Sequence, residues 1–197
     1  MYNNFSKIIF FVSLSLLFIS CDLLTTRDAE DPENSRSSYI AATTPDQLFT
    51  NLRNSFSEKI TKDYMSCFVD SSFLKITYSF TPSSEAIFKY NSLNDWDLES
   101  EDIYFRNLVN ALSENDNIIL TLELLSNSVE GNIENRNYNY KITLPIIDES
   151  TYSIYEGNAF FKVNLDANNQ WVITEWTDTK VSDNPTWSEL KGRFHLF

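Results

Sequence analysis

A long β-hairpin predicted over residues 152–180 constrains the fold more than any other stretch of the chain. Alternate residues are apolar along its first arm, from Ala159 to Leu165, and again along its second arm, at Trp171 and Ile173. The link between the arms, residues 166–169, reads DANN, which is typical of a turn. A hairpin alone is only marginally stable in water. The rest of the chain is therefore expected to supply strands and helices that cover one of its faces.

The residues before the hairpin predict those covering elements. Thr44, Pro45 and Gln47 have the pattern of a helix start with a capping box. Gly157, inside the hairpin's first arm, is interpreted as a β-bulge. The remaining periodicities predict helices over 62–69, 84–90 and 100–113, strands over 73–80, 118–125 and 136–146, and a short C-terminal helix over 184–192. The expected fold class is α+β: a bent, mainly antiparallel β-meander wrapped around about three N-terminal helices.

The first 21 residues have the pattern of a targeting segment. One lysine, Lys7, precedes an apolar run over 8–19 that is too short to span a bilayer comfortably. The run ends in LFISC (residues 17–21), which resembles the lipobox of bacterial lipoproteins. An ordinary signal with a chance cysteine, or an uncleaved anchor, are the other interpretations. The resemblance implies cleavage of residues 1–20, lipidation of Cys21 through its sulfur and acylation, such as palmitoylation, of the new amine.

The lipoprotein resemblance sets the expected organisation and location. Residues 21–43 would be the lipidated cysteine and a flexible tether, because they are polar, charged and aperiodic. Residues 44–197 would form a single α+β domain with a short C-terminal extension after about 180. The lipid would hold the protein to a membrane of the bacterial cell envelope, on the periplasmic face or the cell surface. The net charge of −13 disfavours nucleic acid as a partner.

The hairpin also carries a resemblance to a fold family. The patterns Gly157-x-Ala159-x-Phe161 and Trp171-x-Ile173-x-x-Trp176-x-Asp178, with the order of elements, are similar to the nuclear transport factor two-like superfamily, which has a cystatin-like α+β fold. In that superfamily the sheet curls round the helices into a cone, often with a pocket. Its members include ketosteroid isomerase, scytalone dehydratase, polyketide cyclases and non-catalytic modules. The resemblance implies a possible small apolar ligand and a possible homodimer through the outer sheet face.

No catalytic set and no cofactor motif is identified in the sequence. The only histidine, His195, is near the C-terminus, and Cys67, the second of two cysteines, is interpreted as a buried hydrophobe. Three glycines cannot supply a nucleotide-binding motif, and no metal site is expected. The candidate pocket residues are Tyr64, Tyr104, Glu123, Trp171, Glu175 and Trp176. Of these, Glu123 and Glu175 lie among apolar strand neighbours and are the candidates for buried carboxylates.

These observations favour a lipid-anchored cell-envelope protein whose domain binds a ligand or acts as a scaffold without catalysis. The alternative is a small-molecule enzyme of isomerase or dehydratase type that uses a pocket carboxylate and a tyrosine. A solidly filled interior would count against the alternative.

Overall fold

The computed structural model describes residues 37–72, 74–149 and 151–196. The predicted lipid site, Cys21, and the signal segment lie outside the described residues. In chain order the elements are α2 (Pro45–Glu58), α3 (Thr61–Met65), β1 (Ser79–Thr81), α4 (Ser84–Lys89), the 3-10 helix η3 (Asn91–Asp95), α5 (Leu98–Asn110), β2 (Ile119–Glu130), β3 (Ile133–Thr143), β4 (Ile154–Leu165), β5 (Trp171–Thr179) and α6 (Trp187–His195).

A curled five-stranded sheet, in the order β1-β5-β4-β3-β2, organises the domain. Neighbouring strands are antiparallel, except that β1 runs parallel to β5. The predicted hairpin is confirmed as β4 and β5, and its turn is held by Asp166, whose Oδ1 accepts hydrogen bonds from the backbone N–H groups of Asn168 and Gln170 at 2.8 Å. The expected α+β fold class is therefore confirmed.

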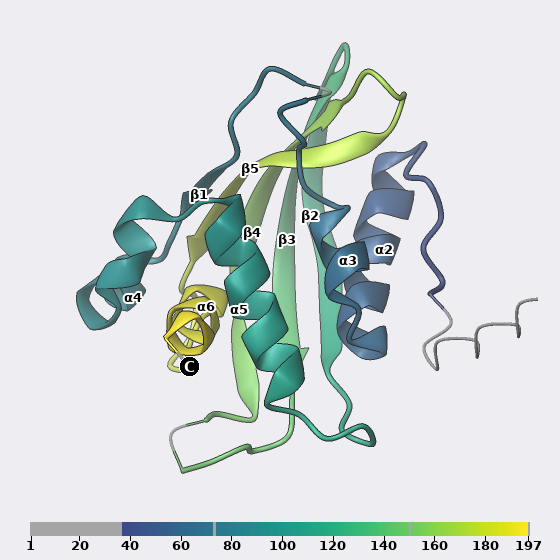
Figure 1. Ribbon diagram of the computed structural model, residues 1–197. Helices are drawn as coiled ribbons and strands as arrows, with labels where there is room; N and C mark the ends of the chain where they lie inside the picture. The colour runs from purple at the N-terminus through teal and green to yellow at the C-terminus, as the bar shows by residue number, and fades with distance from the viewer. Residues whose placement is uncertain (1–36, 73, 150, 197) are drawn as a thin grey trace, which may run out of the picture. The chain divides into compact units, whose positions relative to one another are not determined.

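Helices α2, α3, α5 and α6 lie on one face of the sheet (Figure 1). The sheet buries alternate side chains against them, as the period-two pattern of β3 predicts: Tyr138, Tyr140 and Ile142 are all buried. The matching stripe on α5 is Tyr104, Phe105 and Leu108, which are fully buried. The core therefore lies between the helices and the inner face of the sheet.

The capping box predicted at the start of α2 is only half formed. Thr44 Oγ1 accepts a hydrogen bond from the Gln47 backbone N–H at 3.2 Å, but the Gln47 side chain donates to Asn51 instead. A complete capping box is present at α6, between Thr186 and Glu189. This cap fixes the start of α6, whose apolar side chains are buried in the core.

Several predicted element boundaries are wrong, including the end of the helix predicted over 62–69, which stops at Met65, and the end of the strand predicted over 118–125, which continues to Glu130. Strand pairing near residues 73–80 is limited to β1, because the chain turns at Asp70 and Tyr78 points its side chain into the interior. Helix α5 begins at Leu98, two residues before the helix predicted over 100–113, because Asp97 caps it by accepting a hydrogen bond from the Ser100 backbone N–H at 2.9 Å.

Gly157 is not the predicted bulge. It pairs in regular register with Tyr140, and the register shifts fall between Lys162 and Val163 on β4 and between Leu124 and Ser126 on β2. The requirement at Gly157 is space, since a Cβ there would lie 2.6 Å from both the Thr179 carbonyl oxygen and the Tyr140 hydroxyl.

Both ends of the described chain pack more closely than the sequence indicated. Residues 37–43, assigned to the tether, contact the domain: Ala42 is buried, and its carbonyl accepts a hydrogen bond from the Trp171 N–H at 2.8 Å. Helix α6, expected as a short extension that ends at Gly192, continues to His195. Its apolar side chains, including Trp187 and Phe194, are fully buried, so α6 is part of the core.

Candidate functional site

One carboxylate in the space between the helices and the sheet has no solvent exposure at all. It belongs to Glu101, in the first turn of α5. It accepts hydrogen bonds from the Tyr64 hydroxyl at 2.7 Å, the Tyr78 hydroxyl at 2.6 Å and the Trp96 indole N–H at 2.8 Å. Three neutral donors from three different segments therefore converge on one charged group.

Lys191 of α6 neutralises that carboxylate. Its ammonium group donates to Glu101 Oε1, and both side chains are fully buried. The same nitrogen lies 3.6 Å from the centroid of the Trp176 ring and 3.8 Å from that of the Phe80 ring. Aromatic faces attract cations, so the rings offset part of the cost of removing the charge from water.

The protonation states follow from this burial. Burial lowers the pKa of Lys191 to about 8, although the negative charge of Glu101 opposes the shift. Burial, and next the charge of Glu101, raise the pKa values of Tyr64 and Tyr78 well above their ordinary range. Both phenols therefore remain hydrogen-bond donors, and the Glu101 carboxylate is held by donors on both of its oxygens. A general base must be within reach of a substrate, and Glu101 is fully buried and paired with Lys191.

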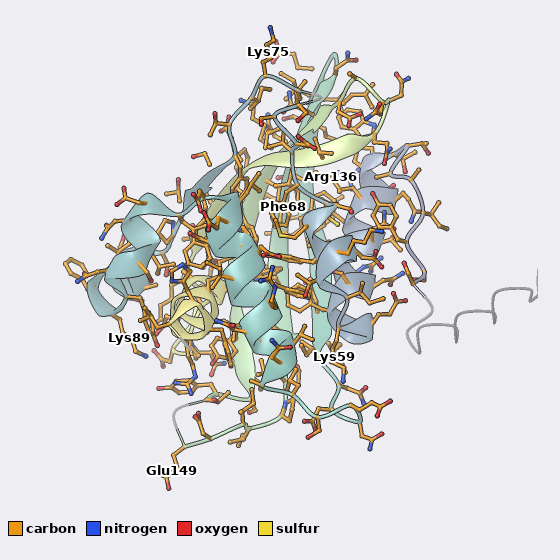
Figure 2. All side chains as sticks on the ribbon, viewed as in Figure 1. Lys59, Phe68, Lys75, Lys89, Arg136 and Glu149 are labelled. Atoms are coloured by element: carbon orange, nitrogen blue, oxygen red, sulfur yellow. The ribbon has the colours of Figure 1, made fainter. Side chains whose placement is uncertain are left out.

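Side chains fill the space between the helices and the sheet (Figure 2), and aromatic rings surround the ion pair. Trp176 and Trp187 meet edge to face with centroids 4.4 Å apart, and Phe161 lies 4.9 Å from Trp176. The Trp187 indole N–H donates to the Tyr104 hydroxyl at 3.0 Å. The interior that a ligand would occupy in a hollow fold of this kind is thus taken by side chains of α5, α6 and β5.

A second buried acid fixes the N-terminal end of α6. Asp178 of β5 accepts hydrogen bonds from the Ser188 backbone N–H at 2.8 Å, the Ser188 hydroxyl and the Tyr140 hydroxyl at 2.7 Å. The Tyr140 hydroxyl in turn accepts a hydrogen bond from the backbone N–H of Trp187 at 2.7 Å. The pKa of Asp178 is raised by burial, although the hydrogen bonds to its carboxylate oppose the shift. The carboxylate lies at the positive end of the helix dipole, which locks α6 into the interior.

The structure brings together only some of the candidate pocket residues. Tyr64, Tyr104 and Trp176 are fully buried beside Glu101 and Lys191. Trp171 is partly exposed at the start of β5.

The expected burial of Glu123 and Glu175 is wrong. Both are exposed, and Glu175 pairs with Lys162 across the outer sheet face at 2.7 Å. The alternation of a strand places every second residue on the outer face whatever its apolar neighbours in sequence, and both glutamates fall on that face.

The acid and base that are buried were missed at the sequence level. Helical spacing contains the signal, since Glu101 precedes Tyr104, Phe105 and Leu108 by three, four and seven residues, on the buried stripe of α5. Lys191 follows Trp187 by four residues and precedes Phe194 by three, on the buried stripe of α6. A charge of each sign on two apolar helical faces therefore indicated a buried pair.

The described residues also bear on metal ligation, on membrane-spanning helices and on the second cysteine. Among residues 37–72, 74–149 and 151–196 no group of three or more histidine, cysteine or acidic side chains is placed to hold a metal ion. Within the same ranges no helix has the length and apolar character needed to cross a bilayer. Cys67 is fully buried, as predicted, and burial raises the pKa of its thiol.

Comparisons with known proteins place the fold. A candidate calcium/calmodulin-dependent protein kinase type II association domain from Thiobacillus denitrificans is 11% identical; the match covers 73% of this chain and 99% of that chain, with a TM-score of 0.50. A protein of unknown function from Mycobacterium tuberculosis is 14% identical over 77% of this chain and 88% of that chain, also with a TM-score of 0.50. A nuclear transport factor two-like protein of unknown function from Pseudomonas putida is 12% identical over 70% and 84% of the two chains, with a TM-score of 0.46.

Proteins described as nuclear transport factor two-like or as having a cystatin-like fold are among the structural neighbours, with TM-scores of 0.46 and 0.45. At these identities the likeness shows the fold and leaves the function open. No protein-family model and no curated protein sequence matches the chain.

Proposed function

We propose that the chain is a lipid-anchored protein of the bacterial cell envelope whose α+β domain binds or scaffolds without catalysis. The observation that supports the non-catalytic domain is the occupation of its interior by Lys191, which neutralises the only carboxylate that several phenols surround among the described residues. The sequence LFISC before residue 22 supports the anchor. Two or more acyl chains bind a membrane firmly, because each buried methylene contributes about 0.8 kcal/mol.

The two cysteines of the chain allow a matched test of the anchor. Cells that express the chain are fed an alkyne fatty acid, and the protein is fractionated and labelled by click chemistry. We expect the label and the membrane association to be lost in Cys21→Ser and kept in Cys67→Ser, because Cys67 is buried and lies outside the lipobox. Equal membrane retention of the Cys21→Ser protein would refute the lipid anchor.

The alternative, an isomerase or dehydratase-type enzyme, has one observation in its favour. Glu101 with Tyr64 and Tyr78 is a carboxylate that two phenols contact, which is the kind of set that such chemistry needs. A substrate could reach Glu101 only if α6 withdrew Lys191 from the interior. The test is a thermal-shift screen of small apolar ketones and steroids against the wild type and Lys191→Ala. Stabilisation of the wild type by a compound that contacts Glu101 would favour the enzyme.

Homodimerisation through the outer sheet face remains a prediction. That face carries the exposed apolar side chains Ile119 and Phe160 together with the Lys162–Glu175 ion pair. Two separate apolar side chains among polar groups cover less apolar area than most obligate interfaces bury. Light scattering of the purified chain tests the prediction, and a monomeric mass at micromolar concentration would overturn it.

A further inference from the structure

Strand β2 leaves one long edge of the sheet unpaired by any residue in the described part of the chain. It is 12 residues long, lies last in the strand order, and pairs only with β3 (Figure 1). An unpaired edge presents free backbone N–H and C=O groups, and proteins usually protect it with lysine, proline or shortness. β1, at the opposite edge, is only 3 residues long. β2 reads ILTLELLSNSVE, with neither lysine nor proline.

Apolar side chains gather on one face of this edge. Leu124 is 44% exposed and Val129 is 63% exposed. Leu124 pairs with Tyr138 and Val129 with Glu134, and both partners belong to the buried face of β3. An even-numbered and an odd-numbered residue share a face because the register shift between Leu124 and Ser126 displaces the alternation by one. The edge therefore offers two apolar side chains on the inner side of the sheet, beyond the cover of the helices.

Acidic side chains gather on the other face. Glu123 pairs with Asn139, and Glu130 pairs with Ile133 on the far side of the register shift, so both glutamates point to the outer side. They are the only charged residues of β2. A neighbouring strand would thus meet apolar groups on the inner side of β2, and on its outer side two negative charges together with the exposed Ile119 at the start of the strand.

A depression beside Leu124 adds a place for a side chain of that neighbour. It has a volume of about 220 Å³ and lies between α2 and the inner face of β2 and β3. Phe49, Leu122 and Tyr138 line it together with Arg136, which is labelled in Figure 2 and is paired with Asp46 at 2.5 Å. In strand addition, backbone hydrogen bonds supply affinity, and depressions of this kind select the side chains of the added strand.

We propose that β2 is a docking edge for an extended segment of a partner polypeptide, in which apolar residues alternate with lysine or arginine. The segment adds a sixth strand: its apolar side chains cover Leu124 and Val129, and its basic side chains lie beside Glu123 and Glu130. The net charge of −13 favours a basic partner over a second copy of this chain. The proposal deepens the scaffolding role and rests on that role, but it does not depend on the lipid.

The test uses the purified full chain in mild detergent and a fluorescein-labelled peptide of 12 residues, the length of β2, in which lysine and valine alternate and both ends are blocked. We expect fluorescence anisotropy to show binding, and hydrogen exchange to show new protection of the β2 amides. A lysine–serine peptide and a glutamate–valine peptide should each bind at least about tenfold more weakly, since several cross-strand pairs together exceed 1.4 kcal/mol.

Variants of the edge make the test specific. Glu123→Lys and Val129→Lys should each weaken the lysine–valine peptide by about tenfold when the lost cross-strand pair and the new charge repulsion are combined. The matched control is Ile146→Lys, which changes a side chain that is 69% exposed in the segment after β3 and should leave binding unchanged. Unchanged protection of the α5 amides shows that each variant is folded.

Several results would overturn the proposal. Equal binding of the lysine–serine peptide would mean that charge alone attracts it, and equal binding to Val129→Lys would place it elsewhere. A dimer by light scattering that Val129→Lys dissociates would show that a second copy occupies the edge. Failure of the fatty-acid labelling of Cys21 would refute the lipid anchor and leave the docking edge untouched. Failure of the peptide to bind β2 would refute the docking edge and leave the lipid anchor untouched, so the two failures are distinguishable.

Discussion

Replacement of Glu101 by glutamine should destabilise the domain more than any isosteric change at its surface. The amide keeps the shape of the carboxylate and can keep most of its hydrogen bonds to Tyr64, Tyr78 and Trp96. What it removes is the charge opposite Lys191, which has no exposure and no other carboxylate in direct ion-pair contact among the described residues. Loss of one partner of a buried ion pair costs about 3–5 kcal/mol.

The lowered pKa of Lys191 concerns a related quantity, the cost of the buried ammonium charge while Glu101 is present. Its fall from 10.5 to about 8 means that the folded state disfavours the ammonium form by about 3 kcal/mol even with Glu101 present. Without Glu101, the cause that raises this pKa is lost, and the value falls further. In the glutamine variant the folded chain therefore holds Lys191 neutral near pH 7, while the unfolded chain keeps it charged.

The sign of the pH dependence follows from linkage. Between the folded and the unfolded pKa the unfolded chain binds more protons, so the stability of the wild type rises from about pH 8 towards 10.5, by at most about 1.4 kcal/mol per pH unit. In Glu101→Gln the rise begins at a lower pH. The difference in stability between the two proteins therefore shrinks as the pH rises towards 8.

Urea unfolding followed by tryptophan fluorescence measures each step, because Trp96 and Trp176 lie against the pair. The control is the cycle that Lys191→Met completes: each single variant should lose about 3–5 kcal/mol, and the double variant should be much closer to the wild type. Additive losses in the cycle, or a Glu101→Gln loss below about 1 kcal/mol, would refute the reasoning, as would a Lys191→Met protein with the same rise above pH 8.

Substitutions at Gly157 and Thr186 and a thiol-labelling experiment on Cys67 further test the packing of the domain. Gly157→Ala should cost about 1–3 kcal/mol in urea unfolding, since its Cβ would lie 2.6 Å from the Tyr140 hydroxyl; Gly131→Ala, which meets no atom within 4 Å but has a φ of +60°, should cost only about 1 kcal/mol. Thr186→Val removes the cap oxygen of α6 and should cost about 1 kcal/mol, with Thr186→Ser restoring most of it. Cys67 should react with a thiol reagent only as fast as the domain unfolds between pH 7 and 9, because burial raises its pKa; rapid labelling of the folded chain would contradict its burial.

Much of the fold follows from local patterns in the sequence. The β4–β5 hairpin is confirmed because strict alternation and a turn cluster act within one continuous segment. Likewise, Thr44 and Pro45 fix the start of α2 through contacts that are local to the first turn. Boundaries failed where a distant contact decided them. Tyr78 leaves the predicted strand because its hydroxyl reaches Glu101 on another element.

The buried pair was harder to foresee, for a physical reason. A charged residue at a helix start is commonly solvated and favoured by the helix dipole, and Glu101 satisfies that description in the sequence. The pattern of α5 alone cannot show that a lysine 90 residues later will meet it. Only the buried stripes of α5 and α6 taken together predict the ion pair. Each stripe carries one ionisable group, the two groups have opposite charges, and both helices pack their apolar faces against the same sheet.

The same reasoning explains why the interior is closed while the edge is open. Inside, Glu101, Lys191 and Asp178 each have a partner of opposite sign or several hydrogen bonds, so little remains for a ligand to satisfy beyond isolated groups such as the Trp176 indole N–H, which is buried without a hydrogen-bond partner in the described part of the chain. Along β2 the opposite holds. No partner strand among the described residues covers the backbone groups of its free edge, its exposed apolar side chains or its two carboxylates. Binding energy is available where groups are unsatisfied, and a domain built this way is therefore better suited to hold another polypeptide at its margin than a small molecule in its core.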